Sequence, residues 1–351
     1  MKVVVAMSGG VDSSVAAALM VQAGHEVIGI MLRLWAEASC RDNACCAPEA
    51  VEQARAVAES LGIPFYVLDY QETFKELVVE PFTQTYLQAA TPNPCLICNR
   101  KVRFGALMDE ARSLGAQKLV SGHYVRLEEQ AGTYRLLKGL DATKDQSYVL
   151  YQLDQEQLAH CLFPLGGMDK VEVRRLAQEM GLEVASKPDS QDLCFVGDDG
   201  YRGFLGRHAE KAILPGEFVD LEGNQLGRHM GLPYYTVGQR RGLGISAAEP
   251  LYVVALDAQK NQVVLGPQGA RQASQVVLGD LRFQQPLDEH LQRELTARIR
   301  YNMKEAPVQV EVVAGGKLVL HFDPPVLDVT PGQGAVIYDG DLLVGGGTIL
   351  R

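Results

Sequence analysis

The stretch VVVAMSGGVDSS, residues 3–14, joins an apolar run to a glycine turn and the start of a helical pattern. The apolar run predicts a buried strand over residues 3–7, and the text after the turn predicts a helix over 13–23. Two adjacent glycines allow a tight turn and a close approach of the backbone to a ligand. The amides of a helix N-terminus, with two serine hydroxyls beside them, favour an anion. The stretch therefore predicts a phosphate-binding loop, with simple helix capping by Asp12 or Ser13 as the alternative.

The alternation of strand and helix continues to about residue 125. Short apolar runs predict further strands over residues 27–32, 65–68 and 118–122. Helical patterns lie between them, over residues 48–61, 72–87 and 101–114. Such alternation is typical of a parallel sheet that is covered by helices on both faces. Ligands of these sheets bind at the carboxyl ends of the strands, which is where the predicted phosphate loop lies.

The second half of the chain reads differently. Residues 124–137 alternate like a hairpin, and residues 144–181 look helical in pieces. From Leu214 onward, glycine and proline separate short alternating stretches that predict strands. These stretches are residues 217–220, 251–256, 262–265, 298–301, 308–313 and 317–322. We therefore divide the chain into an α/β domain over 1–200, a small β-rich domain over 201–272 and a C-terminal β domain over 273–351.

The composition sets limits on the function. The chain has 351 residues, of which 47% are hydrophobic and 22% charged, as in ordinary globular domains. No apolar run approaches the roughly 18–20 residues of a membrane-spanning helix, and no small-residue cleavage site follows the apolar N-terminus. We therefore expect a cytoplasmic protein without a membrane partner. Because the net charge is −10, a nucleic-acid partner requires a local basic surface.

Seven cysteines in irregular spacing suit a reducing compartment, where they serve as thiols, metal ligands or catalysts. Cys95 and Cys98 form a CxxC pair after two prolines, and Cys194 follows much later. Cys161 has the apolar neighbours of a core residue, whereas the group Cys40, Cys45 and Cys46 has no assigned role. A CxxC pair suits half of a zinc site, a redox pair or a cluster. The lack of a second CxxC disfavours zinc.

The heptapeptide SGGVDSS, residues 8–14, resembles the signature of the pyrophosphatase-loop family of ATP enzymes. It is neither the GxxxxGK[ST] loop nor GxGxxG. The resemblance implies that ATP is cleaved between its α- and β-phosphates and that a substrate carbonyl oxygen becomes an adenylate. Such a loop in one domain with several cysteines indicates a sulfur nucleophile. Sulfur is then delivered either by a cysteine persulfide and a second, resolving cysteine, or by an iron–sulfur cluster with one open iron.

Nearly the whole chain resembles the bacterial tRNA-specific 2-thiouridylases. The shared motifs are residues 6–14, 91–94, 98–99, 122–124, 144–148, 189–191, 194–195 and 235–244. The resemblance implies a pyrophosphatase-loop α/β domain, a small central tRNA-contacting domain and a C-terminal β-barrel. It also implies a tRNA-binding sulfurtransferase that thiolates carbon 2 of the wobble uridine, with ATP and Mg²⁺. For Mg²⁺, Asp12 is the one ligand we suspect.

The resemblance also implies roles for individual residues. Cys194 corresponds to the persulfide cysteine, and Cys98 to the catalytic nucleophile that releases its sulfur and forms a disulfide with it. The ATP-binding positions are Ala6, Met7, Ser8, Gly9, Gly10, Val11, Asp12, Ser13, Leu32 and Gly122. The tRNA-contacting positions are Asn93, Pro94, Cys95, His123, Lys144, Asp145, Gln146, Arg300, Tyr301 and Gln333, of which the first three meet the target base.

One departure from the family pattern concerns Cys95, where many members have aspartate. A carboxylate base is therefore missing at this position. The change instead yields three thiols, Cys95, Cys98 and Cys194, which is the ligand complement of a [4Fe-4S] cluster with one free iron. The cluster and the persulfide relay stay open as alternative hypotheses.

Basic residues are concentrated locally, with six Lys or Arg against four Asp or Glu between Gly200 and Ile245. The candidates for phosphate contact are Arg202, Arg207, Lys211, Arg240 and Arg241, with Arg100, Lys101 and Arg103 after the CxxC pair. The resemblance implies lysine, glutamate and glutamine tRNAs as substrates, and a cysteine desulfurase or sulfur-relay protein as donor. The competing interpretations are an amide-forming synthetase that shares the loop and a non-catalytic nucleotide or metal sensor.

Overall fold

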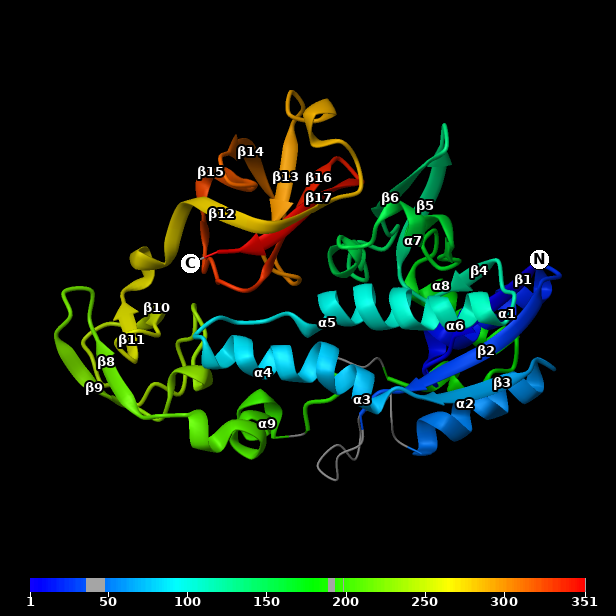
Figure 1. Cartoon of the computed structure of the whole chain (residues 1–351), viewed down its shortest axis with the longest axis horizontal. Helices are drawn as coiled ribbons and strands as arrows, with labels where there is room; N and C mark the ends of the chain where they lie inside the picture. Colours follow the sequence, from blue (N-terminus) through cyan, green and yellow to red (C-terminus); the bar gives the residue numbers. More distant parts are fainter. Residues whose placement is uncertain (36–47, 189–192, 198, 351) are drawn as a thin grey trace.

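The computed structural model describes residues 1–35, 48–188, 193–197 and 199–350 (Figure 1). The structure contains three sheets: a parallel sheet of five strands, a sheet of four and a sheet of eight. The predicted fold class, a parallel α/β domain followed by two β-rich parts, is therefore confirmed. Among the described helices, none has the length and apolar character needed to cross a lipid bilayer.

The N-terminal strand lies at the centre of the parallel sheet. In sheet order its strands are β3 (Phe65–Asp69), β2 (Glu26–Arg33), β1 (Lys2–Ala6), β4 (Lys118–Val120) and β7 (Cys161–Leu162). Successive residues of β1 enter different cores, because Val4 packs in one hydrophobic cluster and Val3 and Val5 pack in another. This two-sided burial explains why β1 is a continuous apolar run.

Helices cover both faces of this sheet. The cluster that contains Val3 and Val5 is closed by α1 (Val11–Gln22), α2 (Pro48–Ser60) and α8 (Lys170–Glu179). The opposite cluster is closed by α3 (Gln71–Phe74), α4 (Glu80–Leu87), α5 (Pro94–Ile97), α6 (Leu107–Ser113) and α9 (Gly200–Ala209). The short helix α7 (Gln155–Ala159) lies next to β6. The predicted helices therefore form, and their apolar faces supply the core.

Two of the predicted helices contain wider, π-helical turns. Residues 71–87 include η1 (Lys75–Val79), and residues 94–113 include η2 (Cys98–Ala106) between α5 and α6. Helical periodicity in the sequence does not distinguish such turns from α-helix, so they were not predicted. π-helical turns are frequent at functional sites, and η2 begins at Cys98.

The predicted hairpin forms as β5 (Val125–Gln130) and β6 (Thr133–Lys138). Strand β6 pairs with β17 (Leu342–Ile349), where Leu137 lies opposite Leu342. The hairpin therefore extends the C-terminal sheet. A long-range pairing of this kind leaves no local mark in the sequence, and it joins the α/β part to the C-terminal part.

The middle sheet has the strand order β10 (Tyr252–Asp257), β11 (Gln262–Gly266), β8 (Gly216–Val219) and β9 (Gln225–His229). Its own small core includes Phe218, Leu232, Tyr235 and Val253. In Figure 1 this sheet lies at the end of the molecule opposite the parallel sheet.

The C-terminal strands close into a six-stranded barrel, because β12 pairs with both β15 and β17. The order is β12 (Gln272–Phe283), β15 (Lys317–Leu327), β14 (Ala306–Val313), β13 (Leu295–Arg298), β16 (Gly334–Asp339) and β17. One predicted strand differs: residues 298–301 are not a strand, since β13 ends at Arg298. Arg300 instead donates to the carbonyls of Val237 and Asp328, which ties the turn to neighbouring loops.

Candidate functional site

The loop between β1 and α1 has the geometry of an anion cradle. Gly10 caps α1 with its backbone only, so no side chain blocks the amides of the first turn. Gly9 has a φ of +68°, and a Cβ there would lie 2.4 Å from the Ala50 carbonyl oxygen. The serine hydroxyls were expected to point at the anion. Instead, Ser13 and Ser14 donate to the Gly10 carbonyl at 3.1 and 2.9 Å, so they brace the loop.

A cavity of about 580 Å³ opens beside this loop, at the carboxyl ends of β1, β2 and β4. Nine of the ten residues predicted to bind ATP line it, namely Ala6, Met7, Ser8, Gly10, Val11, Asp12, Ser13, Leu32 and Gly122. The tenth, Gly9, shapes the loop. Gly122 has no room for a side chain, because a Cβ there would lie 2.9 Å from the Asp12 carbonyl carbon.

The cavity has an apolar end and a polar end. The apolar wall consists of residues from β2, Ile30, Met31 and Leu32, and of Leu34 just after this strand. The glycine loop and several lysines form the polar lining. A cavity of this size can hold a nucleotide, because it has one apolar wall and, at the other end, a glycine loop and lysines that favour an anion.

Asp12 is the carboxylate that lines the cavity, and it is held by two groups. The Lys170 ammonium donates to its two oxygens at 2.7 and 2.9 Å, and the Tyr124 hydroxyl donates at 2.7 Å. The Lys170 side chain is 11% exposed and the Asp12 side chain 34%, so this ion pair is partly shielded from water. The structure therefore gives the suspected Mg²⁺ ligand an internal cation as its partner.

His123 also lines the cavity, but as a buried group. Its Nδ1 lies 2.6 Å from the Ser121 hydroxyl, and its ring packs near Phe104 and Phe163. Burial, assisted by the charge of Arg103, lowers the pKa of His123 to about 3. The imidazole is therefore neutral at physiological pH, and it can act in the cavity as a polar wall but not as a cation.

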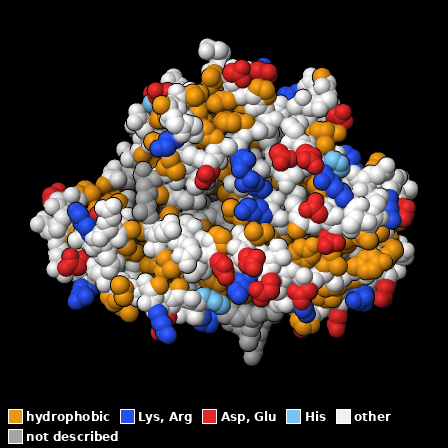
Figure 2. All heavy atoms as spheres, in the orientation of Figure 1, with side chains coloured by type: hydrophobic (Ala, Val, Ile, Leu, Met, Phe, Trp, Pro, Cys, Tyr) orange, Lys and Arg blue, Asp and Glu red, His pale blue; other side chains and the backbone are white. Residues whose placement is uncertain are grey.

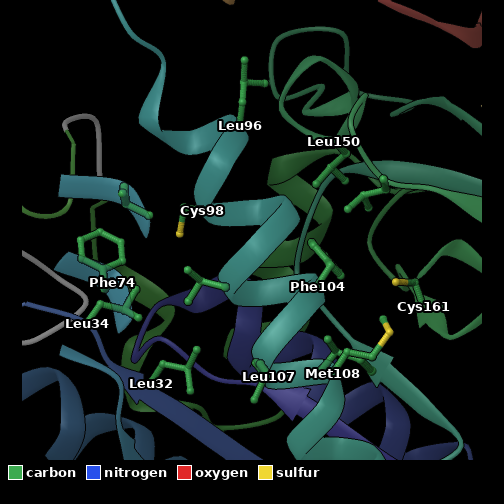
Figure 3. Packing of buried hydrophobic residues seen from close by; sticks show 14 of the residues in the cluster. Leu32, Leu34, Phe74, Leu96, Cys98, Phe104, Leu107, Met108, Leu150 and Cys161 are labelled. Carbon is green, nitrogen blue, oxygen red and sulfur yellow. The ribbon is translucent and has the colours of Figure 1, made fainter. Parts of the chain in front are cut away.

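Cys98 is buried in the hydrophobic cluster that includes Leu32, Leu34 and Leu107, three residues that line the cavity (Figure 3). In Figure 3 its sulfur points from the helix toward the side of the cluster that holds Phe74. Cys194 is partly buried against the same cluster. Cys161 also belongs to it, and burial raises the pKa of this thiol, as predicted for a core cysteine.

The described part of the chain does not show an iron–sulfur site. Within those residues, no three His, Cys, Asp or Glu side chains are grouped so that they could hold a metal ion. Cys95 and Cys98 lie in one helical stretch, but Cys95 is exposed and Cys98 is buried. The structure therefore does not bring Cys95, Cys98 and Cys194 together as ligands. Cys40, Cys45 and Cys46, and the predicted motif at residues 189–191, lie outside the described residues.

The predicted base-contacting segment is held in place by the barrel. Asn93 caps α5 and accepts from the Cys95 amide at 3.2 Å, while Pro94 is buried. Gln333, from the loop before β16, donates to the carbonyls of Thr91 and Pro92 at 2.9 and 3.1 Å. In this structure Gln333 therefore positions the segment that ends at Cys95.

The motif at residues 144–146 divides its residues between two environments. Lys144 and Gln146 line the cavity. Asp145 between them has a side chain that is only 1% exposed and accepts from Arg298 at 2.8 Å. The Asp145 side chain therefore organises the loop from inside.

Arg300 and Tyr301 follow β13 and behave differently from each other. Arg300 is partly buried, and burial lowers its pKa. Tyr301 is 38% exposed and lines the cavity. Burial raises the pKa of Tyr301, with smaller contributions from the charges of Asp145 and then Cys95. Tyr301 thus connects the cavity to the predicted base-contacting segment.

The predicted basic residues of the middle region are exposed, namely Arg202, Arg207, Lys211, Arg240 and Arg241. Arg202 lies near Gly242, which follows Arg240 and Arg241. A Cβ at Gly242 would be 3.7 Å from the Arg202 Nη1. Figure 2 shows further Lys and Arg side chains gathered beside the hollow in the middle of this face. The acidic chain therefore presents local basic surfaces.

Sequence reasoning missed two cationic residues of the cavity, Lys170 and Lys187, and it named a third, Arg103, only as a candidate for phosphate contact. Lys187 lies two residues before the motif at residues 189–191, and this neighbourhood is a signal that could have nominated it. Lys170 has no local signal, because it starts α8 like any polar helix residue and reaches Asp12 only in the folded chain.

Family models match all three parts of the chain. The model described as tRNA methyl transferase HUP domain matches residues 1–198. The tRNA methyl transferase PRC-barrel domain matches residues 202–267, and the aminomethyltransferase beta-barrel domain matches residues 273–349. The three models therefore follow the order of the three sheets.

Similar curated proteins carry the name tRNA-specific 2-thiouridylase MnmA. The protein of Heliobacterium modesticaldum is 47% identical over 355 residues, which is 99% of this chain and 92% of that protein. The protein of Moorella thermoacetica is 47% identical over 358 residues, covering 98% of each. A solved 4-thiouridine synthetase–RNA complex with bound ATP is 17% identical and covers 60% of this chain and 51% of that one, with a TM-score of 0.36. This last likeness is too slight to support an inference.

Proposed function

Because the chain belongs to the family of tRNA-specific 2-thiouridylases, which are tRNA sulfurtransferases, we propose that it replaces the C2 oxygen of the wobble uridine of tRNA by sulfur, at the expense of ATP. One observation carries the proposal. The cavity of about 580 Å³ combines an anion cradle with an apolar wall, and that wall belongs to the hydrophobic cluster that contains Cys98.

In the proposed complex, ATP lies with its base against the β2 wall at Leu32 and Leu34. Its phosphates lie over the amides that follow Gly10, at the N-terminus of α1. Among the described residues that line the cavity, the one acid, Asp12, is paired with Lys170, so these residues give the polar end a positive balance. The described residues do not form a protein cage for Mg²⁺.

The first proposed step activates the base. The uridine O2 attacks the α-phosphorus of ATP, the bond from this phosphorus to the bridging oxygen of the β-phosphate breaks, and pyrophosphate leaves with the electron pair. The N3 proton of the base is lost to solvent. Adenylation turns a poor leaving group into a good one, and the loop amides stabilise the charge on the leaving pyrophosphate.

The second proposed step transfers sulfur. The thiolate of Cys98 attacks the Cys194 sulfur of a Cys194 persulfide, so a Cys98–Cys194 disulfide forms and hydrosulfide leaves. Hydrosulfide adds to C2 and displaces AMP, which leaves 2-thiouridine. A thiol reductant then reduces the disulfide, and a cysteine desulfurase or sulfur-relay protein supplies the next persulfide sulfur. The packing of both cysteines on one cluster supports this pairing.

The tRNA is proposed to bind across the middle domain and the barrel. The exposed arginines around Arg202 and Arg240 contact backbone phosphates, so affinity falls steeply with salt. The wobble base, in an anticodon loop where bases are weakly stacked, is flipped toward Asn93 and Cys95. We propose lysine, glutamate and glutamine tRNAs as the substrate set.

The test is a thiolation assay with the full-length protein, unmodified anticodon-loop tRNA, ATP and a persulfide donor. We expect 2-thiouridine by mass spectrometry, with one AMP and one pyrophosphate per thiolated base. Cys98→Ser and Cys194→Ser should lower thiolation by at least about 10²-fold, whereas Cys161→Ser serves as the matched control and should retain activity. Amide formation without loss in Cys98→Ser would identify a synthetase, and ATP binding without AMP release would identify a sensor.

A further inference from the structure

Lys187 is a cation of the cavity to which the proposed reaction has so far given no task. Its Nζ donates to the Gly9 carbonyl oxygen at 3.0 Å and to the Gln53 Oε1 at 2.5 Å. Within the described residues, no carboxylate pairs with it. Lys170, in contrast, is neutralised by Asp12. Of these two lysines, Lys187 is therefore the one whose charge no carboxylate of the described residues offsets.

The position of this ammonium is fixed from two sides. Gly9 belongs to the phosphate loop itself, so the Lys187 side chain lies against the cradle and lines the cavity. Its backbone is held by Arg174, which donates to the carbonyls of Ala185 and Lys187 at 2.8 and 2.9 Å. The Lys187 ammonium therefore lies at the polar end of the cavity, on a backbone segment that is held by hydrogen bonds.

A partly buried ammonium that is bonded to two neutral oxygens keeps a preference for an anion. The nearest built anion site is the N-terminus of α1, whose amides no side chain caps. Two independent features, the uncapped amides and the unneutralised lysine, therefore converge on one place.

We propose that Lys187 binds the β- and γ-phosphates of ATP and stabilises pyrophosphate as it leaves. The inference rests on the proposed function and names the residue that performs a part of it. When the bond between the α-phosphorus and the bridging oxygen breaks, the electron pair stays on pyrophosphate, and the ammonium offsets this added charge. No covalent bond to Lys187 forms, and its protons stay in place.

The expected ligand is the pyrophosphate end of the nucleotide, so AMP and pyrophosphate separate the roles. Calorimetric titration of the full-length protein measures the Kd of ATP, AMP and inorganic pyrophosphate. Lys187→Gln keeps an amide that can donate to Gly9 but removes the charge. We expect the Kd of pyrophosphate and ATP to rise about tenfold or more, and the Kd of AMP to change less than about twofold.

Two further variants make the test specific. Lys187→Arg keeps the positive charge and should recover most of the affinity for pyrophosphate. Gln53→Leu removes the neutral partner of Lys187 and should leave the pyrophosphate Kd within about threefold. Thermal unfolding of each variant confirms a folded protein, and should Lys187→Gln not fold, Lys187→Met takes its place.

The result that overturns the proposal is equal weakening of AMP and pyrophosphate, or no weakening of either, in a folded Lys187→Gln protein. That failure differs from failure of the proposed function, because the parent protein then still binds ATP and thiolates tRNA. If the parent itself neither binds pyrophosphate nor releases it from ATP, both proposals are wrong.

Discussion

At the scale of single residues, His123 illustrates how a motif residue changes its meaning on folding. By its sequence it belongs to a predicted tRNA-contacting motif, and an exposed histidine there could carry a charge. In the fold it is buried beside Phe104 and bonded to Ser121. A neutral ring is therefore required at the cavity wall, and protonation works against the folded state.

This burial predicts a pH dependence of stability. The pKa of His123 is lowered from an ordinary value of 6.5 to about 3, so between these values the unfolded chain binds a proton that the folded chain does not. The contribution of His123 is therefore complete above pH 6.5 and is lost progressively as the pH falls, by about 1.4 kcal/mol at pH 5.5. Urea unfolding at pH 7.5 and 5.5 measures it.

The comparison variant is His123→Gln, which keeps a polar partner for Ser121 and removes the titrating ring. The loss of stability between pH 7.5 and 5.5 should be smaller in this variant by about 1.4 kcal/mol. An identical loss in both proteins would show that His123 is already protonated or not titrating in this range.

At the scale of elements, the barrel loop of residues 330–334 docks on the segment of residues 91–96. The Thr91 amide donates to the Pro331 carbonyl at 2.8 Å, and Gln333 donates back to the carbonyls of Thr91 and Pro92. Gly332 permits this approach, because a Cβ there would lie 2.9 Å from the Thr91 oxygen. The helix start that presents Cys95 and Cys98 is thus positioned by a distant strand connection.

This docking predicts a selective defect in Gln333→Leu. Two carbonyls lose their donor, which should lower the free energy of unfolding by about 1–3 kcal/mol. The KM for tRNA should rise, since the loosened segment is the one proposed to meet the base, while the Kd of ATP should stay within about twofold. Steady-state thiolation kinetics and nucleotide titration measure these values.

The matched control for this prediction is Gln309→Leu, on an exposed position of β14 in the same barrel. It should leave the KM for tRNA and the Kd of ATP unchanged. If Gln333→Leu shifts the ATP Kd as much as the KM for tRNA, the docking loop acts on the whole fold and the selective role is wrong.

At the scale of the whole molecule, one ion-pair network joins the region of β6 and Asp145 to the C-terminal barrel. Lys138 of β6 bonds Glu305 at 2.7 Å, Glu305 bonds Arg298 of β13 at 2.8 Å, and Arg298 bonds Asp145 at 2.8 Å. Asp145 also accepts from the amides of Gly139 and Ser147. Since Lys144 and Gln146 flank Asp145 and line the cavity, the barrel helps to hold one wall of the nucleotide site.

This network predicts that Arg298→Met is costly in two ways. It leaves the nearly inaccessible Asp145 carboxylate without its cation, which should lower the free energy of unfolding by about 3–5 kcal/mol. The loosened loop should also raise the Kd of ATP, although Arg298 does not line the cavity. Urea unfolding and nucleotide titration are the measurements.

The control is Arg293→Met, which removes a 59% exposed arginine of the barrel from its pair with Asp339. It should change stability by less than about 1 kcal/mol. In the double variant Asp145→Asn with Arg298→Met, the losses should be clearly less than additive. Additive losses would mean that the two residues are not energetically coupled.

The sequence by itself determined the local order of the fold. The apolar run at residues 3–7, the glycine turn and the helix after it predict a strand, a loop and a helix because each depends on nearest neighbours and periodicity. The same holds for the predicted strands that formed in the middle sheet and barrel, at residues 217–220, 251–256, 262–265, 308–313 and 317–322. The predicted strand at residues 298–301 failed because Arg300 bonds carbonyls far away in the sequence.

The candidate site divides along the same line. The spacing of Gly9, Gly10 and Asp12 predicts a phosphate loop, and the CxxC pair indicates thiol chemistry. Only the tertiary structure decided that Lys170 pairs with Asp12 and that Lys187 donates to the Gly9 carbonyl. It also decided that Cys95 is exposed whereas Cys98 is buried. The physical reason is range: backbone turns and helix starts are set within a few residues, whereas burial and charge pairing depend on which distant segments meet.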